Sequence, residues 1–440
     1  MAFASSYGPP QLPSEIQEGI IDELQLDLRS LSTCALVSKR WLIRARHWAL
    51  ADRQARIIAC TPNLADGFRV MEQKQDSSEF LRLLHSSKSA LAPYIRNVLI
   101  SGPHVHHSYV SVLDDQANDY RELNARIIET LPLLSAIRSI TISDISWDSL
   151  QPEAKAVIAS LRQVTSVFWK NTVFGNLDDL MQFCDISYPN LQKLKVRRFE
   201  VAKPKVQGGS VSSSTAITFH HLRLLDVDTG QEFHPFLSMS PLWHIRPQLI
   251  ETLCLNNISM NDIALIAALI NGMGASLRYL ALDIAISATV AAMSGNAINL
   301  APVSLLQNTN LRTIEISTIQ ILPDNPLDTS WLQAIMSTIV SPQLEAITLW
   351  VLAVRGLATG FGFRAFESSL VQRTDLLKLA TVRVKFTGMY AWRKEFQAGI
   401  IQEVEEQLPV LHERGLLHVD TQNSLRNGAL DGWTPPSWSL

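Results

Sequence analysis

One short pattern recurs along most of this 440-residue chain: an aliphatic residue, two other residues, an aliphatic, one other residue and a third aliphatic. Alternation of this kind predicts a short β-strand with one face directed inward. About ten copies follow one another, with an aromatic residue closing the third: Ile95-Val98-Ile100, Ile137-Ile140-Ile142, Val164-Val167-Trp169, Leu191-Leu194-Val196, Leu222-Leu225-Val227, Ile250-Leu253-Leu255, Leu277-Leu280-Leu282, Leu311-Ile314-Ile316, Leu344-Ile347-Leu349 and Leu379-Val382-Val384. A chain made of so many like units is expected to fold as a repeat.

The copies are spaced at similar intervals, with helix-like segments between them. Their second aliphatic residues are mostly about 27 to 35 residues apart, and the first gap is about 42 residues. The helix-like segments include Tyr120–Leu131, Pro152–Leu161, Leu177–Cys184, Asn261–Ile270 and Ser330–Val340. A strand and a helix at this period are typical of a solenoid. The alternative is a generic α/β domain with parallel strands and crossover helices, into which ten like units fit less well.

The pattern resembles that of leucine-rich repeats over about 330 residues. The resemblance implies an α/β fold: a solenoid of about ten strand–helix units with parallel strands. The family's Asn or Cys, three residues after the last strand position, is missing in four copies, where Thr172, Phe199, Ile258 and Ala285 stand instead. An irregular arc is therefore expected.

The N-terminus has a different, helical pattern. A first helix is expected from the Leu12-Pro13 start to Leu24, and a second from Leu31 to Trp41. Proline suits the first turn of a helix, and Glu15 suits the positive end of the helix dipole. Ile16, Ile20 and Leu24 recur every four residues and form one apolar stripe. Two such helices cannot close a core alone, so a partner is the natural way to bury this stripe.

The ordered set of N-terminal residues resembles an F-box: Leu12, Pro13, Glu15, Ile16, Ile20 and Leu24, then Leu31, Cys34, Val37, Ser38, Lys39, Arg40 and Trp41. The alternative is an ordinary helical hairpin packed on the rest of the chain. The resemblance implies a small all-helical unit that docks on the Skp-type adaptor of a cullin ubiquitin ligase. Eight residues are assigned to adaptor contact or to the fold that presents it: Leu12, Pro13, Ile16, Ile20, Leu24, Leu31, Val37 and Trp41. An F-box followed by such repeats looks like the expanded fungal F-box families.

These patterns divide the chain into segments. Residues 1–10 are expected to be a flexible tail, 11–50 the F-box-like unit, 51–90 a helical linker, 91–420 the solenoid and 421–440 a tail. Within the linker, Ala51–Ile58 and Ser78–His85 look helical. Residues 207–215, rich in Ser and Gly, are expected to be an insertion. Tyr390–Arg414 is expected to be a helix that caps the solenoid core, and Leu416–Asp420 a last strand.

Composition excludes several classes of protein. Charged residues make up 18% of the chain and the net charge is −3, so nothing global indicates a nucleic-acid or anionic-membrane partner. Cys34, Cys60, Cys184 and Cys254 are far apart and fit reduced core positions of an intracellular, cytoplasmic or nuclear protein. The first ten residues do not form a secretory signal. The uncharged stretch Ile284–Leu311 is interrupted by polar residues, which favours a buried helix and loop over a membrane span.

No catalytic motif is present in the sequence. The nucleophile-elbow, phosphate-loop and dinucleotide-binding patterns are all missing. His104, His106 and His107 form the one dense histidine cluster, and the Gly102-Pro103 step before it indicates a surface loop rather than a metal site. We therefore expect no enzyme activity, no cofactor and no metal.

Function should then reside in a surface. The residues between the strand aliphatics are expected to point outward on the concave side, where repeat solenoids bind their partners. Candidate target-binding residues carry mostly basic, then acidic, then basic side chains: Lys170, Lys195, Arg197, Asp226, Asp228, Asn256, Trp350, Arg383 and Lys385, with Asp283 and Glu315 at further outward positions. The alternative is a solvated face whose order of charges is chance.

Together these features predict the substrate-recognition subunit of a Skp–cullin–F-box ubiquitin ligase. The F-box would bind the adaptor, and through it a cullin, while the repeat arc would bind an unidentified target protein. The alternative is a non-catalytic protein-binding scaffold that acts without a cullin.

Overall fold

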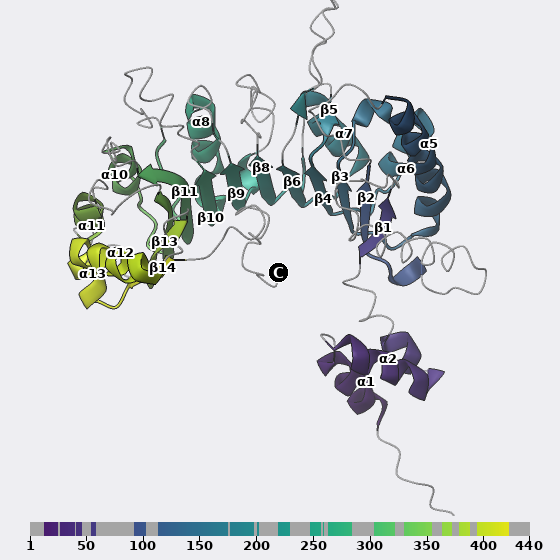
Figure 1. Ribbon diagram of the computed structural model, residues 1–440, viewed down its shortest axis with the longest axis horizontal. Coiled ribbons are helices and arrows are strands. Elements are labelled where there is room, and N and C mark those ends of the chain that lie inside the picture. Colours follow the sequence, from purple (N-terminus) through teal and green to yellow (C-terminus); the bar gives the residue numbers. More distant parts are fainter. Residues whose placement is uncertain are drawn as a thin grey trace, which may run out of the picture. The chain divides into compact units, whose positions relative to one another are not determined.

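The computed structural model describes seventeen segments of the chain: residues 13–24, 27–39, 41–45, 54–58, 92–102, 113–174, 177–197, 200–201, 219–228, 247–256, 258, 263–283, 303–321, 330–353, 363–371, 378–387 and 394–421. It divides into two compact units. The first comprises Met1–Phe174 with Ile186–Asn190, and the second comprises Gly175–Asp185 with Leu191–Leu440. Figure 1 shows the helices and strands coloured along the sequence.

Two helices open the first unit, α1 (Ser14–Glu23) and α2 (Leu28–Val37), and residues 41–45 are helical as well. The α2 helix begins at Asp27, whose carboxylate accepts hydrogen bonds from the backbone N–H groups of Arg29 and Ser30, both at 3.1 Å. The hydrogen bond from the Ser30 hydroxyl makes the largest contribution to lowering the pKa of Asp27. The two backbone hydrogen bonds lower this pKa further. Ser38 is extended, so α2 ends before the predicted helix end at Trp41.

Four parallel strands of the first unit pair in chain order: β1 (Gln54–Ile58), β2 (Asn97–Ser101), β3 (Ser139–Ser143) and β4 (Ser166–Lys170). The α5 helix (Leu113–Thr130) lies between β2 and β3, and α6 (Pro152–Ala159) lies between β3 and β4. The predicted helix over Ala51–Ile58 is wrong at residues 54–58. There, Ala55 and Ile57 align with Val98 and Ile100 of β2, so the linker contributes a strand.

An aromatic cluster fills part of this unit's core. Trp169, the aromatic residue that closes the third copy of the pattern, is fully buried. Its ring meets the edge of the Trp147 ring at a centroid distance of 5.4 Å, and Trp147 stacks on Phe174 of the short strand β5 (Val173–Phe174) at 5.1 Å. Trp169 therefore occupies the inward strand position that an aliphatic residue occupies in the other copies.

Eight parallel strands of the second unit follow one another in chain order: β6 (Lys193–Arg197), β8 (Leu224–Asp228), β9 (Thr252–Asn256), β10 (Tyr279–Asp283), β11 (Thr313–Ile321), β12 (Ala346–Ala353), β13 (Thr381–Thr387) and β14 (Leu417–Thr421). A further two-residue strand, β7, covers Glu200–Val201. The predicted last strand is thus present as β14. The middle aliphatic of each copy aligns with the next, and the row from Leu194 to Val382 is buried.

The α7 helix (Leu177–Ser187) precedes β6. The helices that connect these strands are α8 (Ile263–Met273), α10 (Ser330–Ser337), α11 (Phe363–Val371), α12 (Lys394–Gln407) and α13 (Pro409–Glu413). Figure 1 shows α10, α11 and α12 beside strands β11 to β14. The α11 helix was not predicted, although Phe363, Phe366 and Leu370 follow helical spacing and are buried. The predicted terminal helix is divided at Leu408, where the chain leaves the helical conformation before Pro409.

The fold is an α/β strand–helix repeat solenoid with parallel strands, as the ten copies predicted. At the position of the leucine-rich-repeat Asn, Thr172 and Ile258 are buried, and Phe199 and Ala285 lie outside the described residues. Asn308 supplies a different tie between repeats, because its side-chain amide donates to the carbonyls of Ile270 and Gly274, each at 3.0 Å.

Some sequence features fall outside the described residues: the histidine cluster at 104–107, the insertion at 207–215, most of the uncharged stretch 284–311, the tail 1–10 and residues 422–440 of the other tail. Within the described part, no helix has the length and apolar character needed to cross a membrane. The same part contains no group of three His, Cys, Asp or Glu side chains that could hold a metal. The Cys34, Cys184 and Cys254 side chains are buried.

Candidate protein-binding surfaces

The eight residues assigned to adaptor contact divide by burial. Leu31 is fully buried, and it forms the core of the N-terminal helices with Ile21, Cys34 and Ala45. Leu24 and Trp41 are partly buried against that core. The remaining residues are Leu12, which lies outside the described residues, and Pro13, Ile16, Ile20 and Val37, which are all exposed. Of the three residues in the predicted apolar stripe, Leu24 packs on the core, whereas Ile16 and Ile20 are exposed and accessible to a partner.

Polar contacts tie residues 41–45 to α1. The Trp41 indole N–H donates to the Gln17 side-chain oxygen at 2.8 Å. The Arg44 guanidinium donates to both carboxylate oxygens of Asp22, at 2.7 and 2.5 Å. Bidentate geometry of this kind is specific as well as favourable. Trp41 is thus tied to α1 within the helical unit, and its contact with an adaptor stays a prediction.

Large apolar side chains are unusually exposed in these helices. Nine large hydrophobic residues are exposed in the described part of the chain, and five of them lie between residues 13 and 45. They are Ile16 (51% exposed), Ile20 (43%), Leu36 (88%), Val37 (62%) and Ile43 (59%). Ile16 and Ile20 are four residues apart on α1 and so lie on one face. Apolar exposure at this density is typical of an interaction site.

The side chains between the strand aliphatics form rows on the other face of the second unit's sheet. One row runs Lys195, Asp226, Cys254, Ala281, Glu315, Thr348 and Arg383, in the register of neighbouring strands. Tyr279 lies two residues before Ala281 on β10, and both pack with Cys254 in a small buried cluster. The middle of this face is therefore a packed layer.

A buried ion pair lies in this layer. The Arg197 guanidinium is 3.3 Å from a carboxylate oxygen of Asp226, and their side chains are 8% and 1% exposed. The side-chain amide of Asn256 donates to the other carboxylate oxygen at 3.2 Å. Residues from three adjacent strands, β6, β8 and β9, thus share one carboxylate.

Burial shifts the pKa values of this layer. Desolvation raises the pKa of Asp226, against the attraction of Arg197 and Lys195. Desolvation also lowers the pKa of Lys195 and raises the pKa values of Cys254 and Tyr279. Burial is the largest cause of all four pKa shifts. Asp226, Cys254 and Tyr279 are buried, whereas Lys195 is half-buried.

These findings correct the prediction of an open charged face. Arg197, Asp226 and Asp228 are buried, and so is Asp283. The basic residues of β6 lie beside the acidic residues of β8, because consecutive strands are neighbours in a parallel solenoid. The two charge groups therefore neutralise each other instead of presenting separate patches. Whether these residues contact a target stays a prediction.

The remaining candidates are more accessible. Trp350 and Lys385 are half-buried and aligned on β12 and β13, and the Lys385 ammonium lies 4.1 Å from the centre of the Trp350 ring. Arg383, two residues earlier on β13, is exposed. In the first unit, Lys170 is half-buried at the end of β4. Trp350, Lys385 and Arg383 thus lie together on the neighbouring strands β12 and β13 of this face.

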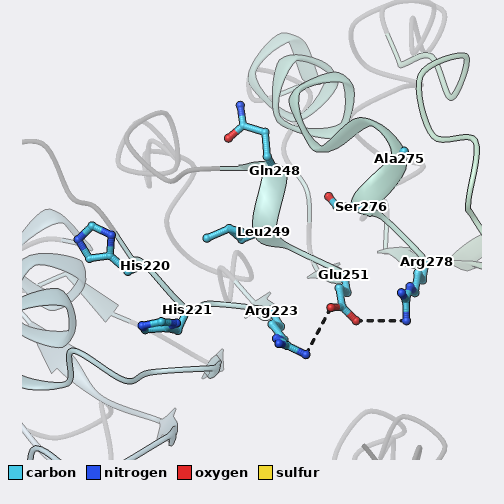
Figure 2. Close-up of a pocket in the computed structure, with 9 residues that line it drawn as sticks. All are labelled: His220, His221, Arg223, Gln248, Leu249, Glu251, Ala275, Ser276 and Arg278. Atoms are coloured by element: carbon cyan, nitrogen blue, oxygen red, sulfur yellow. Dashed lines mark ion pairs between the residues drawn. The ribbon is translucent and has the colours of Figure 1, made fainter.

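A pocket that was not predicted lies at the N-terminal ends of strands β8, β9 and β10. It has a volume of about 270 Å³ and is formed where the chain enters β8, β9 and β10 (Figure 2). Arg223 and Arg278 flank Glu251, and each guanidinium is 3.6 Å from one of the two Glu251 carboxylate oxygens. The signal was in the sequence, because each residue directly follows the first aliphatic of its copy.

No protein-family model matches the chain, and no curated protein matches it. Among solved structures, the chain is similar to a Bacteroides fragilis protein, with 13% identity, a TM-score of 0.38, and coverage of 81% of this chain and 84% of that one. It is also similar to a yeast structure of the Rad7 and Elc1 complex, with 14% identity, a TM-score of 0.35, and coverage of 94% and 93%. A leucine-rich-repeat protein of Leptospira interrogans matches at 12% identity and a TM-score of 0.20, over 66% and 92% of the two chains. Function has to be inferred from this chain's own residues.

Proposed function

We propose that this chain is the substrate-recognition subunit of a Skp–cullin–F-box ubiquitin ligase and does no chemistry itself. The observation that carries the proposal is the set of five exposed aliphatic side chains on the N-terminal helices. Three of them, Ile16, Ile20 and Val37, are positions at which the sequence resembles an F-box. A partner that covers them would gain roughly 25 cal/mol for each Å² of apolar surface removed from water.

The two parts of the chain would have separate tasks. The N-terminal helices would bind the Skp-type adaptor and through it a cullin, in the cytoplasm or the nucleus. The repeat array would bind a target protein, as extended solenoid surfaces do. Holding the target near the ligase raises its effective concentration at the site of ubiquitin transfer, so the chain needs no catalytic residues.

The test is co-expression with a Skp-type adaptor followed by size-exclusion chromatography. We expect wild type to form a one-to-one complex and the Ile16→Asp/Ile20→Asp variant to lose it. The matched control is Ile186→Asp, because Ile186 is 66% exposed but lies on α7 in the array. Unchanged far-UV circular dichroism would show that the double variant is folded.

Two outcomes would contradict the proposal: a wild-type chain that does not bind the adaptor, or a double variant that binds it as well as wild type. A complex that forms with the adaptor but does not recruit a cullin would instead favour the scaffold that acts without one.

A further inference from the structure

The pocket at the entry of β8, β9 and β10 combines positive charge with an apolar contact. The Arg223 and Arg278 side chains are each 54% exposed, whereas Glu251 between them is 26% exposed. Leu249, on the same rim, is 40% exposed. Figure 2 shows His220 and His221 on the side of Arg223, away from Arg278. Two guanidinium groups against one carboxylate leave a net positive charge before the histidines are counted.

The two guanidinium groups have capacity for further acceptors. Each carries five N–H donors, and the separation of 3.6 Å from Glu251 is an ion pair rather than a hydrogen bond. Half of each side chain is open to solvent. Exposed arginines in this arrangement suit recognition of carboxylates, because the guanidinium fork matches the two carboxylate oxygens.

Strand pairing fixes the spacing of these charges. The backbone N–H of Glu251 donates to the Arg223 carbonyl, and that of Arg278 donates to the Glu251 carbonyl, both at 2.8 Å. The three residues are therefore consecutive rungs, and the two arginines are about 10 Å apart at the backbone. The same ladder continues, because the N–H of Arg312 donates to the Arg278 carbonyl at 2.7 Å.

The negative charge of Glu251 restricts which anions the pocket can bind. A single small anion placed between the arginines would meet the Glu251 carboxylate and be repelled. An extended segment in the polyproline II conformation has three residues per turn, so two carboxylates three residues apart lie on one side of it. They span about 9 Å and can contact the outer sides of the two arginines. Leu249 would then accept an apolar side chain of the same segment.

We propose that this pocket binds an acidic, extended segment of a partner protein, with two carboxylates held by Arg223 and Arg278 and an apolar side chain held by Leu249. The inference names a partner class for the repeat array, and to that extent it rests on the proposed function. Its site lies at the strand-entry edge, apart from the face of the sheet that carries Trp350 and Lys385.

The test uses the full chain and a labelled peptide with one leucine and two glutamates three residues apart, with binding followed by fluorescence anisotropy. We expect the Arg223→Gln/Arg278→Gln variant to bind at least tenfold more weakly. The matched control is Arg162→Gln/Arg414→Gln, which removes the same charge at two exposed positions outside the pocket and should bind as wild type does. We expect Glu251→Gln to bind more tightly, because the repelling carboxylate is gone.

Three outcomes would overturn the inference: no binding by wild type, equal weakening in the control variant, or displacement of the peptide by equimolar inorganic phosphate, which would indicate a simple anion site. Adaptor binding should be unchanged in the pocket variant. Peptide binding should likewise be unchanged in the Ile16→Asp/Ile20→Asp variant, so failure of the pocket and failure of the proposed function are distinguishable.

Discussion

The buried ion pair between Arg197 and Asp226 gives the sharpest test of the structure. On an exposed face, replacing Arg197 by Met would change the free energy of unfolding by less than about 0.5 kcal/mol. In the structure, the change removes a charge 3.3 Å from a carboxylate that is 1% exposed. Coulomb attraction at that distance is about 5 kcal/mol at an effective dielectric constant of about 20. Broken buried pairs typically cost about 3 to 5 kcal/mol.

Two features of the site moderate this loss. The hydrogen bond from Asn256 to the Asp226 carboxylate remains, and Asp226 can take up a proton. We therefore expect Arg197→Met to lower the free energy of unfolding by about 3 kcal/mol at neutral pH. The additional change Asp226→Leu should restore most of it, because no buried charge is then left unpaired.

The pH dependence has a definite sign. Burial already raises the pKa of Asp226 above its unfolded value, so its contribution to stability is greatest at low pH and falls as pH rises through the raised pKa. Loss of Arg197 raises this pKa further. The destabilisation by Arg197→Met should therefore be smaller at about pH 4.5 than at about pH 7.

The assay is urea unfolding followed by far-UV circular dichroism, with Arg383→Met as the control. Arg383 carries the same charge on the same face of the sheet but is exposed, so its replacement should stay within about 0.5 kcal/mol of wild type. If Arg197→Met and Arg383→Met were equally mild, the pair would be solvated and the buried layer would be refuted.

Two further predictions concern packing. Gly102→Ala should lower the free energy of unfolding by about 1 to 3 kcal/mol, because the added Cβ would clash with the Asp144 carbonyl oxygen. Gly399→Ala, in α12 with open space around the new Cβ, should instead raise it by about 0.5 to 1 kcal/mol, so equal effects in urea unfolding would contradict the local packing. Lys385→Met should shift the tryptophan fluorescence spectrum, because the Lys385 ammonium lies over the Trp350 ring at 4.1 Å. A spectrum identical to that of wild type would indicate that the Lys385 ammonium does not lie over the Trp350 ring.

The sequence by itself determined the repeat. An aliphatic side chain at every second strand position has to face inward, so the pattern alone assigns Leu225, Leu253 and Leu280 to one row, and all three are buried. The same reasoning located the N-terminal helices and their apolar residues. It failed at residues 54–58, where a strand forms because β2 offers an edge with which to pair.

Only the tertiary structure decided which of these residues are accessible. Helical spacing grouped Ile16, Ile20 and Leu24 together, but packing buried Ile21 and left Ile16 and Ile20 exposed. Alternation assigned Arg197 and Asp226 to a solvent face, yet neighbouring strands brought them together and covered them. Periodicity within a strand gives the face on which a side chain lies. Exposure depends on the residues that adjacent strands place beside it, at separations of about 30 positions in the sequence.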